Sequence, residues 1–98
     1  MTHNELAFLT TLENIIRQRA GQPAASSYTA RLFAAGTRRI AQKVGEEGVE
    51  VALAATAGDR SELLEETADL LYHLLVLLAD RELCLQDAVT VLEERHKA

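Results

Sequence analysis

The feature that most constrains the fold is a set of acidic side chains placed inside apolar stretches of sequence. Glu66 and Asp69 lie in a leucine-rich segment, and Glu46, Glu47 and Glu50 lie in an earlier segment with its own apolar positions. Ionised carboxylates beside buried apolar surface are unstable unless a positive charge neutralises them. A hard divalent cation prefers oxygen ligands and would supply that charge. We therefore expect a fold that groups these acids around a shared cation.

Apolar residues recur at helical spacing along most of the chain, and no stretch reads as a strand. We expect helices over residues 4–20, about 27–57, about 60–81 and about 86–97. Ser26 or Ser27 can cap the second helix, and Asp59 with Glu62 resembles a capping box before the third. Gly36 is expected to disturb the second helix. The pattern predicts an all-α bundle of about four helices, with residues 1–98 as a single domain.

The composition indicates a small protein that buries part of its apolar surface against another copy. The chain has 98 residues, of which 48% are hydrophobic and 4% aromatic. A domain of this size buries only a modest share of its surface alone. The third helix is apolar over more than half of its circumference, which favours burial on several sides. We therefore expect a homodimer.

Charge and targeting signals exclude several classes of protein. The net charge of −5 argues against a nucleic-acid-binding protein, whose signature is a basic patch. No apolar run approaches the roughly 20 residues of a membrane span, so we expect no membrane partner. Cys84 is the single cysteine, and residues 1–5 lack the basic stretch of a signal peptide. These features favour a soluble protein in the cytoplasm.

The spacing of the acids predicts a cleft between the second and third helices. A helix turns by about 100° per residue, which places three acids and two bases on one face of the second helix: Arg39, Lys43, Glu46, Glu47 and Glu50. One arc of the third helix carries Glu62, Glu66, Asp69 and His73. Asp69 and His73 lie at mid-helix, where we expect little solvent. Clustered carboxylates either raise their pKa values or bind a cation. Mg²⁺ suits such a site, because it uses a few carboxylates and completes its shell with water and phosphate oxygens.

Simpler interpretations remain open for most of these residues. Lys43 and Glu47 could form an ordinary solvated i,i+4 pair, although the order of base before acid is the less favourable one. His73 could be a satisfied, partly buried histidine, and Cys84 a packing residue. The arginines at positions 38, 39 and 60 could serve solubility alone.

From Ser27 almost to its end, the chain resembles the phosphoribosyl-ATP pyrophosphatases of histidine biosynthesis. Three stretches carry the resemblance: residues 27–32 (SYTARL), 43–50 (KVGEEGVE) and 68–78 (ADLLYHLLVLL). Residues 93–96 also resemble the family's basic, His-ended C-terminus. The wider group is the MazG-like all-α nucleotide pyrophosphatases, whose acidic pattern this chain matches at Glu46, Glu47, Glu50, Glu66 and Asp69. The family often has Ser or Asp at the position of Cys84, so a weaker helix cap is expected here.

The resemblance implies Mg²⁺-dependent hydrolysis of phosphoribosyl-ATP to phosphoribosyl-AMP and pyrophosphate by a homodimer. It implies metal ligation by four acids: Glu47, Glu50, Glu66 and Asp69. Glu46 would hold a second metal or orient the attacking water, so Glu46 and Glu47 are the catalytic candidates. The expected substrate-binding residues are Tyr28, Thr29, Arg31, Arg39, Lys43 and His73. Tyr28 and Thr29 open the second helix, where backbone N–H groups suit an anion.

Other functions are compatible with parts of the pattern. Another all-α nucleotide pyrophosphatase would share the acids without needing residues 27–29 or 71–73. A di-iron carboxylate protein would need two Glu-x-x-His motifs, of which residues 93–96 provide one. A non-catalytic dimerisation module would explain the leucines but not the aligned acids. Some relatives of this kind are fused behind the next enzyme of the pathway, and we expect a stand-alone enzyme.

Overall fold

The computed structural model describes residues 5–97 and shows five α-helices in that part of the chain. They are α1 (Phe8–Ala20), α2 (Tyr28–Ala35), α3 (Thr37–Ala57), α4 (Arg60–Asp80) and α5 (Leu85–Arg95), with short 3-10 helices at Glu5–Ala7 and Ala24–Ser26. No strand occurs between residues 5 and 97, which confirms the all-α class. The expected first helix begins later than predicted: its first described turn is 3-10, and residue 4 lies outside the described residues.

The prediction of one long second helix is wrong, because the chain breaks at Gly36. Gly36 has φ +94° and ψ 173°, a conformation that is essentially restricted to glycine. It ends α2 and begins α3, so the expected four helices become five. The change of direction at this residue lets α2 contact α4 and brings Tyr28 to His73.

Side-chain caps begin the helices close to where the sequence predicts. The Ser27 hydroxyl accepts a hydrogen bond from the Ala30 N–H at 3.0 Å, and the Asp59 carboxylate accepts one from the Glu62 N–H at 2.9 Å. At Cys84, the residue before α5, the helix start is held by a side chain inside the helix. The Cys84 backbone N–H donates to the Asp87 carboxylate at 2.9 Å. Asp87 therefore supplies the anchoring that the cysteine thiol offers only weakly.

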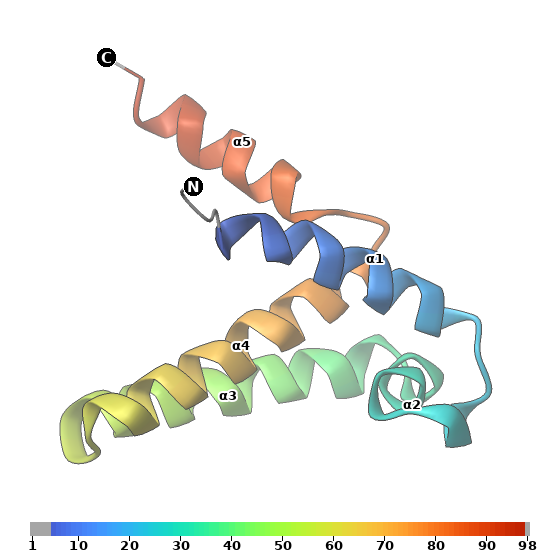
Figure 1. Ribbon diagram of the computed structural model, residues 1–98, viewed down its shortest axis with the longest axis horizontal. Coiled ribbons are helices and arrows are strands. Elements are labelled where there is room, and N and C mark those ends of the chain that lie inside the picture. Colours follow the sequence, from blue (N-terminus) through green and yellow to red (C-terminus); the bar gives the residue numbers. More distant parts are fainter. Residues whose placement is uncertain (1–4, 98) are drawn as a thin grey trace.

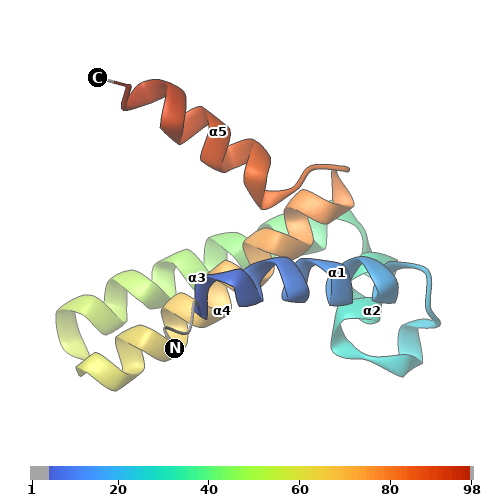
Figure 2. The same ribbon diagram turned by 45° about the horizontal axis from the view of Figure 1, so that its top comes forward.

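Helices α3 and α4 run side by side as a hairpin, and the other helices are arranged about it (Figure 1). Helix α1 contacts both α2 and α4, and α2 packs at the end of the hairpin where α3 begins. The buried core lies where these helices meet and consists of Ile16, Leu32, Ile40, Leu75 and Val76. Helix α5 is joined to α1 by the Leu85 N–H, which donates to the Glu13 carboxylate at 2.8 Å. Its remaining length projects away from the hairpin (Figure 2).

Several large apolar side chains stay exposed on the chain taken alone. Leu64 on α4 is 71% exposed and Val49 on α3 is 59% exposed, and Leu71 and Leu74 are also exposed. The single chain therefore leaves part of the apolar surface of α4 uncovered, and its burial in a dimer stays a prediction. None of the helices among the described residues is both long and apolar enough to cross a membrane.

Candidate metal centre

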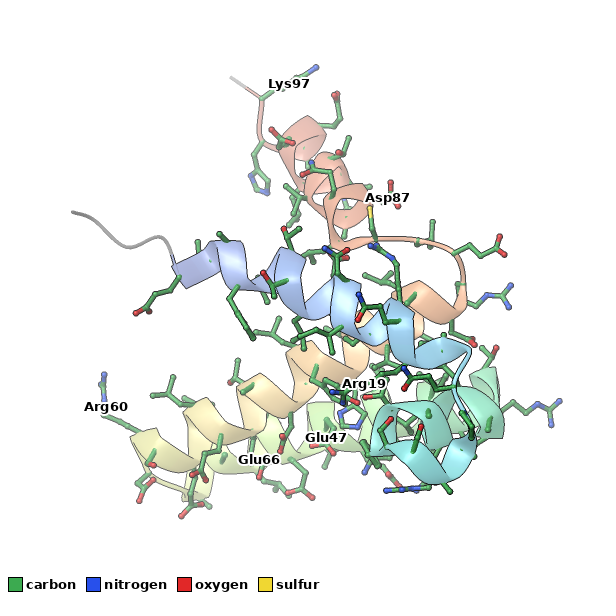
Figure 3. The ribbon with its side chains drawn as sticks, turned by 45° about the vertical axis from the view of Figure 1, so that its right-hand side comes forward. Arg19, Glu47, Arg60, Glu66, Asp87 and Lys97 are labelled. Atoms are coloured by element: carbon green, nitrogen blue, oxygen red, sulfur yellow. The ribbon has the colours of Figure 1, made fainter. Side chains whose placement is uncertain are left out.

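Three acids from the α3–α4 hairpin converge on one point. Glu47, Glu66 and Asp69 each offer a carboxylate oxygen, and these oxygens lie within 4.8 Å of one another. Glu47 projects from α3 and is only 9% exposed, whereas Glu66 and Asp69 come from successive turns of α4. Figure 3 shows the Glu47 and Glu66 side chains close to each other between the two helices. The predicted meeting of the two acid stripes is thus observed for these three residues.

The donor set of this group fits a hard divalent cation. All three donors are carboxylate oxygens, the ligand type that Mg²⁺ and Ca²⁺ prefer. Oxygens bound to Mg²⁺ at about 2.1 Å in an octahedron are separated by about 3–4 Å, so the observed spacing needs only small side-chain rotations. Asp69 is exposed, contrary to the expectation of little solvent at this position, and the group is therefore open to water and ligand.

The pKa of Glu66 is raised by burial and by the negative charges that surround it. Partial burial raises the pKa of Glu66, and the nearby carboxylates of Asp69, Glu50, Glu47 and Glu65 raise it further. Each cause disfavours the ionised form of the side chain. A bound cation would reverse the sign of the local field and favour the ionised form.

Glu50, the fourth expected ligand, lies beside this group and is not one of the three converging acids. It lines a neighbouring pocket of about 200 Å³ together with Leu53, Ala54, Ala57, Gly58, Glu62 and Glu66. Gly58 permits the close packing at the base of this pocket, since a Cβ there would lie 3.0 Å from the Ala54 carbonyl oxygen. The side chain of Glu66 borders both the pocket and the acid group.

Lys43 pairs with both catalytic candidates on α3. Its ammonium nitrogen lies 3.3 Å from a carboxylate oxygen of Glu47 and 3.7 Å from one of Glu46. Burial lowers the pKa of Lys43, but the hydrogen bond to Glu47 and the charges of Tyr28, Glu47 and Glu46 outweigh it, and the pKa is raised overall. Glu46 is exposed and accepts a further hydrogen bond from Gln42 at 3.2 Å. Glu47 therefore points toward Glu66 and Asp69, while Glu46 lies at the exposed edge of the site.

An aromatic and histidine cluster connects α2 to α4. The Tyr28 hydroxyl lies 2.9 Å from Nε2 of His73, and Nδ1 of His73 lies 2.7 Å from the backbone oxygen of Asp69. Tyr28 stacks on Tyr72 with ring centroids 6.2 Å apart. His73 is only 5% exposed, so the interpretation of a satisfied buried histidine describes its surroundings correctly.

Tyr72 is a site neighbour that sequence reasoning did not single out. Its hydroxyl forms a hydrogen bond with the hydroxyl of Thr29, which is itself buried. Burial raises the pKa of Tyr72, with a smaller opposing effect from the bond to Thr29. The available signal was its position next to His73 in an apolar helix, where a tyrosine hydroxyl needs a partner.

The two expected arginines lie at the edge of the site. The Arg31 guanidinium is 5.8 Å from the centroid of the Tyr28 ring, a cation–π distance. Arg39 is exposed on α3, one turn before Lys43. The structure thus brings Tyr28, Thr29, Arg31 and His73 together around the start of α2, and leaves Arg39 on the α3 surface.

Comparison with known proteins identifies the family of this chain. Residues 9–96 match the family described as phosphoribosyl-ATP pyrophosphohydrolase. The chain belongs to this family. The resemblance seen in the sequence is thereby confirmed, and the matched residues begin before Ser27.

The chain also matches curated proteins. It is 57% identical to the histidine biosynthesis bifunctional protein HisIE of Vibrio cholerae over 94 residues, which cover 96% of this chain and 45% of that protein. It is 60% identical to the protein of the same name from Photobacterium profundum over 91 residues, 93% of this chain and 44% of that protein. The chain thus spans about half the length of the curated relatives that it matches.

Proposed function

We propose that this chain hydrolyses phosphoribosyl-ATP to phosphoribosyl-AMP and pyrophosphate, the second step of histidine biosynthesis. The observation that carries the proposal is the convergence of Glu47, Glu66 and Asp69 in a chain of the phosphoribosyl-ATP pyrophosphohydrolase family. Acids that meet at one point on a solvent-accessible face provide the charge needed to hold a cation against a polyphosphate. The rest of the site supplies positive and polar groups for the nucleotide.

Mg²⁺ is the proposed cofactor, held by Glu47, Glu66 and Asp69 with Glu50 as the fourth carboxylate. When bound there, Mg²⁺ supplies a positive charge that ligates phosphate oxygens and favours ionisation of water. Glu50 is included because its charge already acts on Glu66 and its side chain lines the adjoining pocket.

Glu46 and Glu47 are the proposed catalytic residues. Glu47 is nearly buried between the hairpin helices, which suits a carboxylate that stays fixed while substrate exchanges. Glu46 on the rim can orient the attacking water or bind a second ion. Lys43 holds both side chains in place by its ion pairs, and it can turn one or more N–H groups toward a phosphate.

The substrate is proposed to lie between the acid group and the start of α2. Arg31, Arg39 and Lys43 provide positive charge for phosphate oxygens, and Arg39 needs an extended side chain to reach them. Thr29 and Tyr28 occupy the first turn of α2, where backbone N–H groups attract an anion. His73 contributes through Tyr28, as developed below.

One experiment tests the assignment directly: pyrophosphate release from phosphoribosyl-ATP, with and without Mg²⁺. We expect release only with the cation. Asp69→Asn and Glu50→Gln should lose most turnover and keep their fold, whereas the matched exposed substitution Glu93→Gln on α5 should leave turnover unchanged. Wild-type turnover in either site variant would remove that residue from the site. Hydrolysis of other nucleotides in place of phosphoribosyl-ATP would assign the chain to a different all-α pyrophosphatase.

The proposed functional unit is a homodimer of this single domain, located in the cytoplasm and without nucleic-acid or membrane partners. Exposed apolar residues on both helices of the hairpin support the dimer: Val49, Leu53, Leu64, Leu71 and Leu74. Apolar patches of this kind commonly mark a protein interface. Light scattering at micromolar concentration should give twice the mass of the chain, and a monomer there would refute the dimer.

A further inference from the structure

The hydrogen bonds of His73 determine where its proton resides. Nδ1 lies 2.7 Å from the backbone oxygen of Asp69, and a carbonyl oxygen can only accept. Nδ1 must therefore carry a hydrogen. In the neutral imidazole, Nε2 then has a lone pair and no hydrogen.

The same logic fixes the direction of the bond to Tyr28. The Tyr28 hydroxyl lies 2.9 Å from Nε2, which can only accept in this tautomer, so the tyrosine donates its proton to His73. The phenolic oxygen has no second hydrogen to donate. Toward any other neighbour it presents lone pairs alone.

The Tyr28 side chain is accessible to solvent and lies near groups of the proposed site. Tyr28 is 42% exposed, whereas His73 behind it is 5% exposed. Tyr28 is also close enough to Lys43 for the two side chains to interact electrostatically. His73 in turn follows Asp69 by one turn of α4 and is bonded to its backbone. The acceptor is thus linked through His73 to the residue that carries one of the three converging carboxylates.

We propose that His73 is a positioning residue that fixes the Tyr28 hydroxyl as a hydrogen-bond acceptor for an O–H or N–H group of the nucleotide. Phosphate oxygens are themselves acceptors at neutral pH and cannot pair with it. The donors of a nucleotide are its ribose hydroxyls and the amino group of its base. This inference rests on the proposed function, because it names a contact within the same substrate site.

A double-mutant cycle tests whether His73 acts through Tyr28. Tyr28→Phe removes the acceptor and should raise KM about three- to tenfold with kcat little changed, the size expected for one uncharged hydrogen bond made equally in ground and transition states. His73→Phe should raise KM similarly in the wild-type background and add nothing in the Tyr28→Phe background. An equal further loss in that background would overturn the positioning role.

A conservative variant separates positioning from folding. His73→Gln places an amide oxygen near the position of Nε2, so it should restore a KM close to that of the wild type. All variants should keep the increase in Tm produced by Mg²⁺, which reports the intact acid group. Failure of His73→Gln to restore KM, with that increase retained, counts against the proposal.

Nitrogen-15 NMR of the substrate-free protein tests the tautomer without any turnover. The neutral His73 imidazole, assigned by its loss in His73→Gln, should show a protonated Nδ1 and a bare Nε2. A hydrogen on Nε2 would overturn the inference. If the wild-type protein itself released no pyrophosphate, the proposed function would fail, and the nucleotide contact with it. Failure of the proposed function is thus distinguished from failure of the Tyr28 contact, because it is seen in the wild-type protein before any substitution is made.

The donor on the nucleotide is identified with a substrate prepared from dATP, which lacks one ribose hydroxyl. A smaller Tyr28→Phe effect on this substrate would place the donor at the missing hydroxyl. An undiminished effect would place it at another O–H or N–H group. Either result supports an acceptor at Tyr28, and no Tyr28→Phe effect on either substrate would refute it.

Discussion

Replacing Gly36 with alanine should destabilise the protein through the backbone alone. Gly36 has φ +94° and ψ 173°, and a Cβ built there meets nothing within 4 Å. No steric clash with neighbouring side chains therefore contributes. The cost is that of holding a residue with a Cβ in a region open essentially to glycine, about 1–3 kcal/mol.

Gly21→Ala is the matched control for this substitution. Gly21 also has open space around its Cβ position, but its φ of −94° is accessible to alanine. Alanine at position 21 reduces the conformational freedom of the unfolded chain. The free energy of unfolding should therefore stay unchanged or rise by up to about 1 kcal/mol. The two variants make the same chemical change and are expected to differ in sign.

Urea unfolding at one fixed protein concentration measures both variants, since a dimer's stability depends on concentration. For a domain of this size each kcal/mol corresponds to about 4–8 °C in Tm, so Gly36→Ala should lower Tm by about 4–24 °C. Equal midpoints for Gly36→Ala and Gly21→Ala would show that the positive φ at the α2–α3 junction is not a constraint, and the reasoning would fail.

Three further substitutions probe the acid group, the core and a helix cap. Because the pKa of Glu66 is raised in the folded, metal-free protein, the folded state holds a proton that the unfolded state releases, and stability falls as pH rises above the ordinary carboxyl value of 4.5. Glu66→Gln should therefore raise Tm at pH 7 in the presence of EDTA and change it less at pH 4; a lower Tm at pH 7 would contradict the crowding of charge. Ile40→Ala removes a fully buried side chain from the core and should cost about 2–5 kcal/mol in chemical denaturation, while a loss below about 1 kcal/mol would show that the site collapses without a cavity. Asp59→Ala removes the 2.9 Å bond to the Glu62 N–H and should cost about 0.5–2 kcal/mol, with an unchanged unfolding midpoint as the opposing result.

The helices were predictable because short-range physics determines them. Asp59 and Ser27 cap the helices that their positions predict, and apolar spacing sets the extents of α1, α4 and α5 to within a few residues. The sequence indicated a disturbance at Gly36 but not that the chain would end one helix there and begin another. A glycine inside a helical pattern costs only about 1 kcal/mol, so the sequence cannot distinguish a tolerated glycine from a change of direction.

The site was predictable in composition and less so in geometry. Glu46, Glu47 and Glu50 span about 100° of a helix, which is too wide an arc for all three to face one neighbouring helix. Packing against α4 turns Glu47 inward and leaves Glu46 and Glu50 exposed. The bond between Tyr28 and His73 joins residues far apart in the chain, and it depends on how α2 folds back onto α4.

The hairpin of α3 and α4 also has a consequence for the order of assembly. The acids from Glu47 to Asp69 belong to one uninterrupted stretch of chain, so bringing them together closes only a short loop and costs little chain entropy. The cation-binding half of the site is thus a local structure that can form before α1 docks. Tyr28 reaches the site through a contact of much larger sequence separation, its bond to His73. We therefore expect the cation-binding half of the site to form earlier in folding than the nucleotide-binding half.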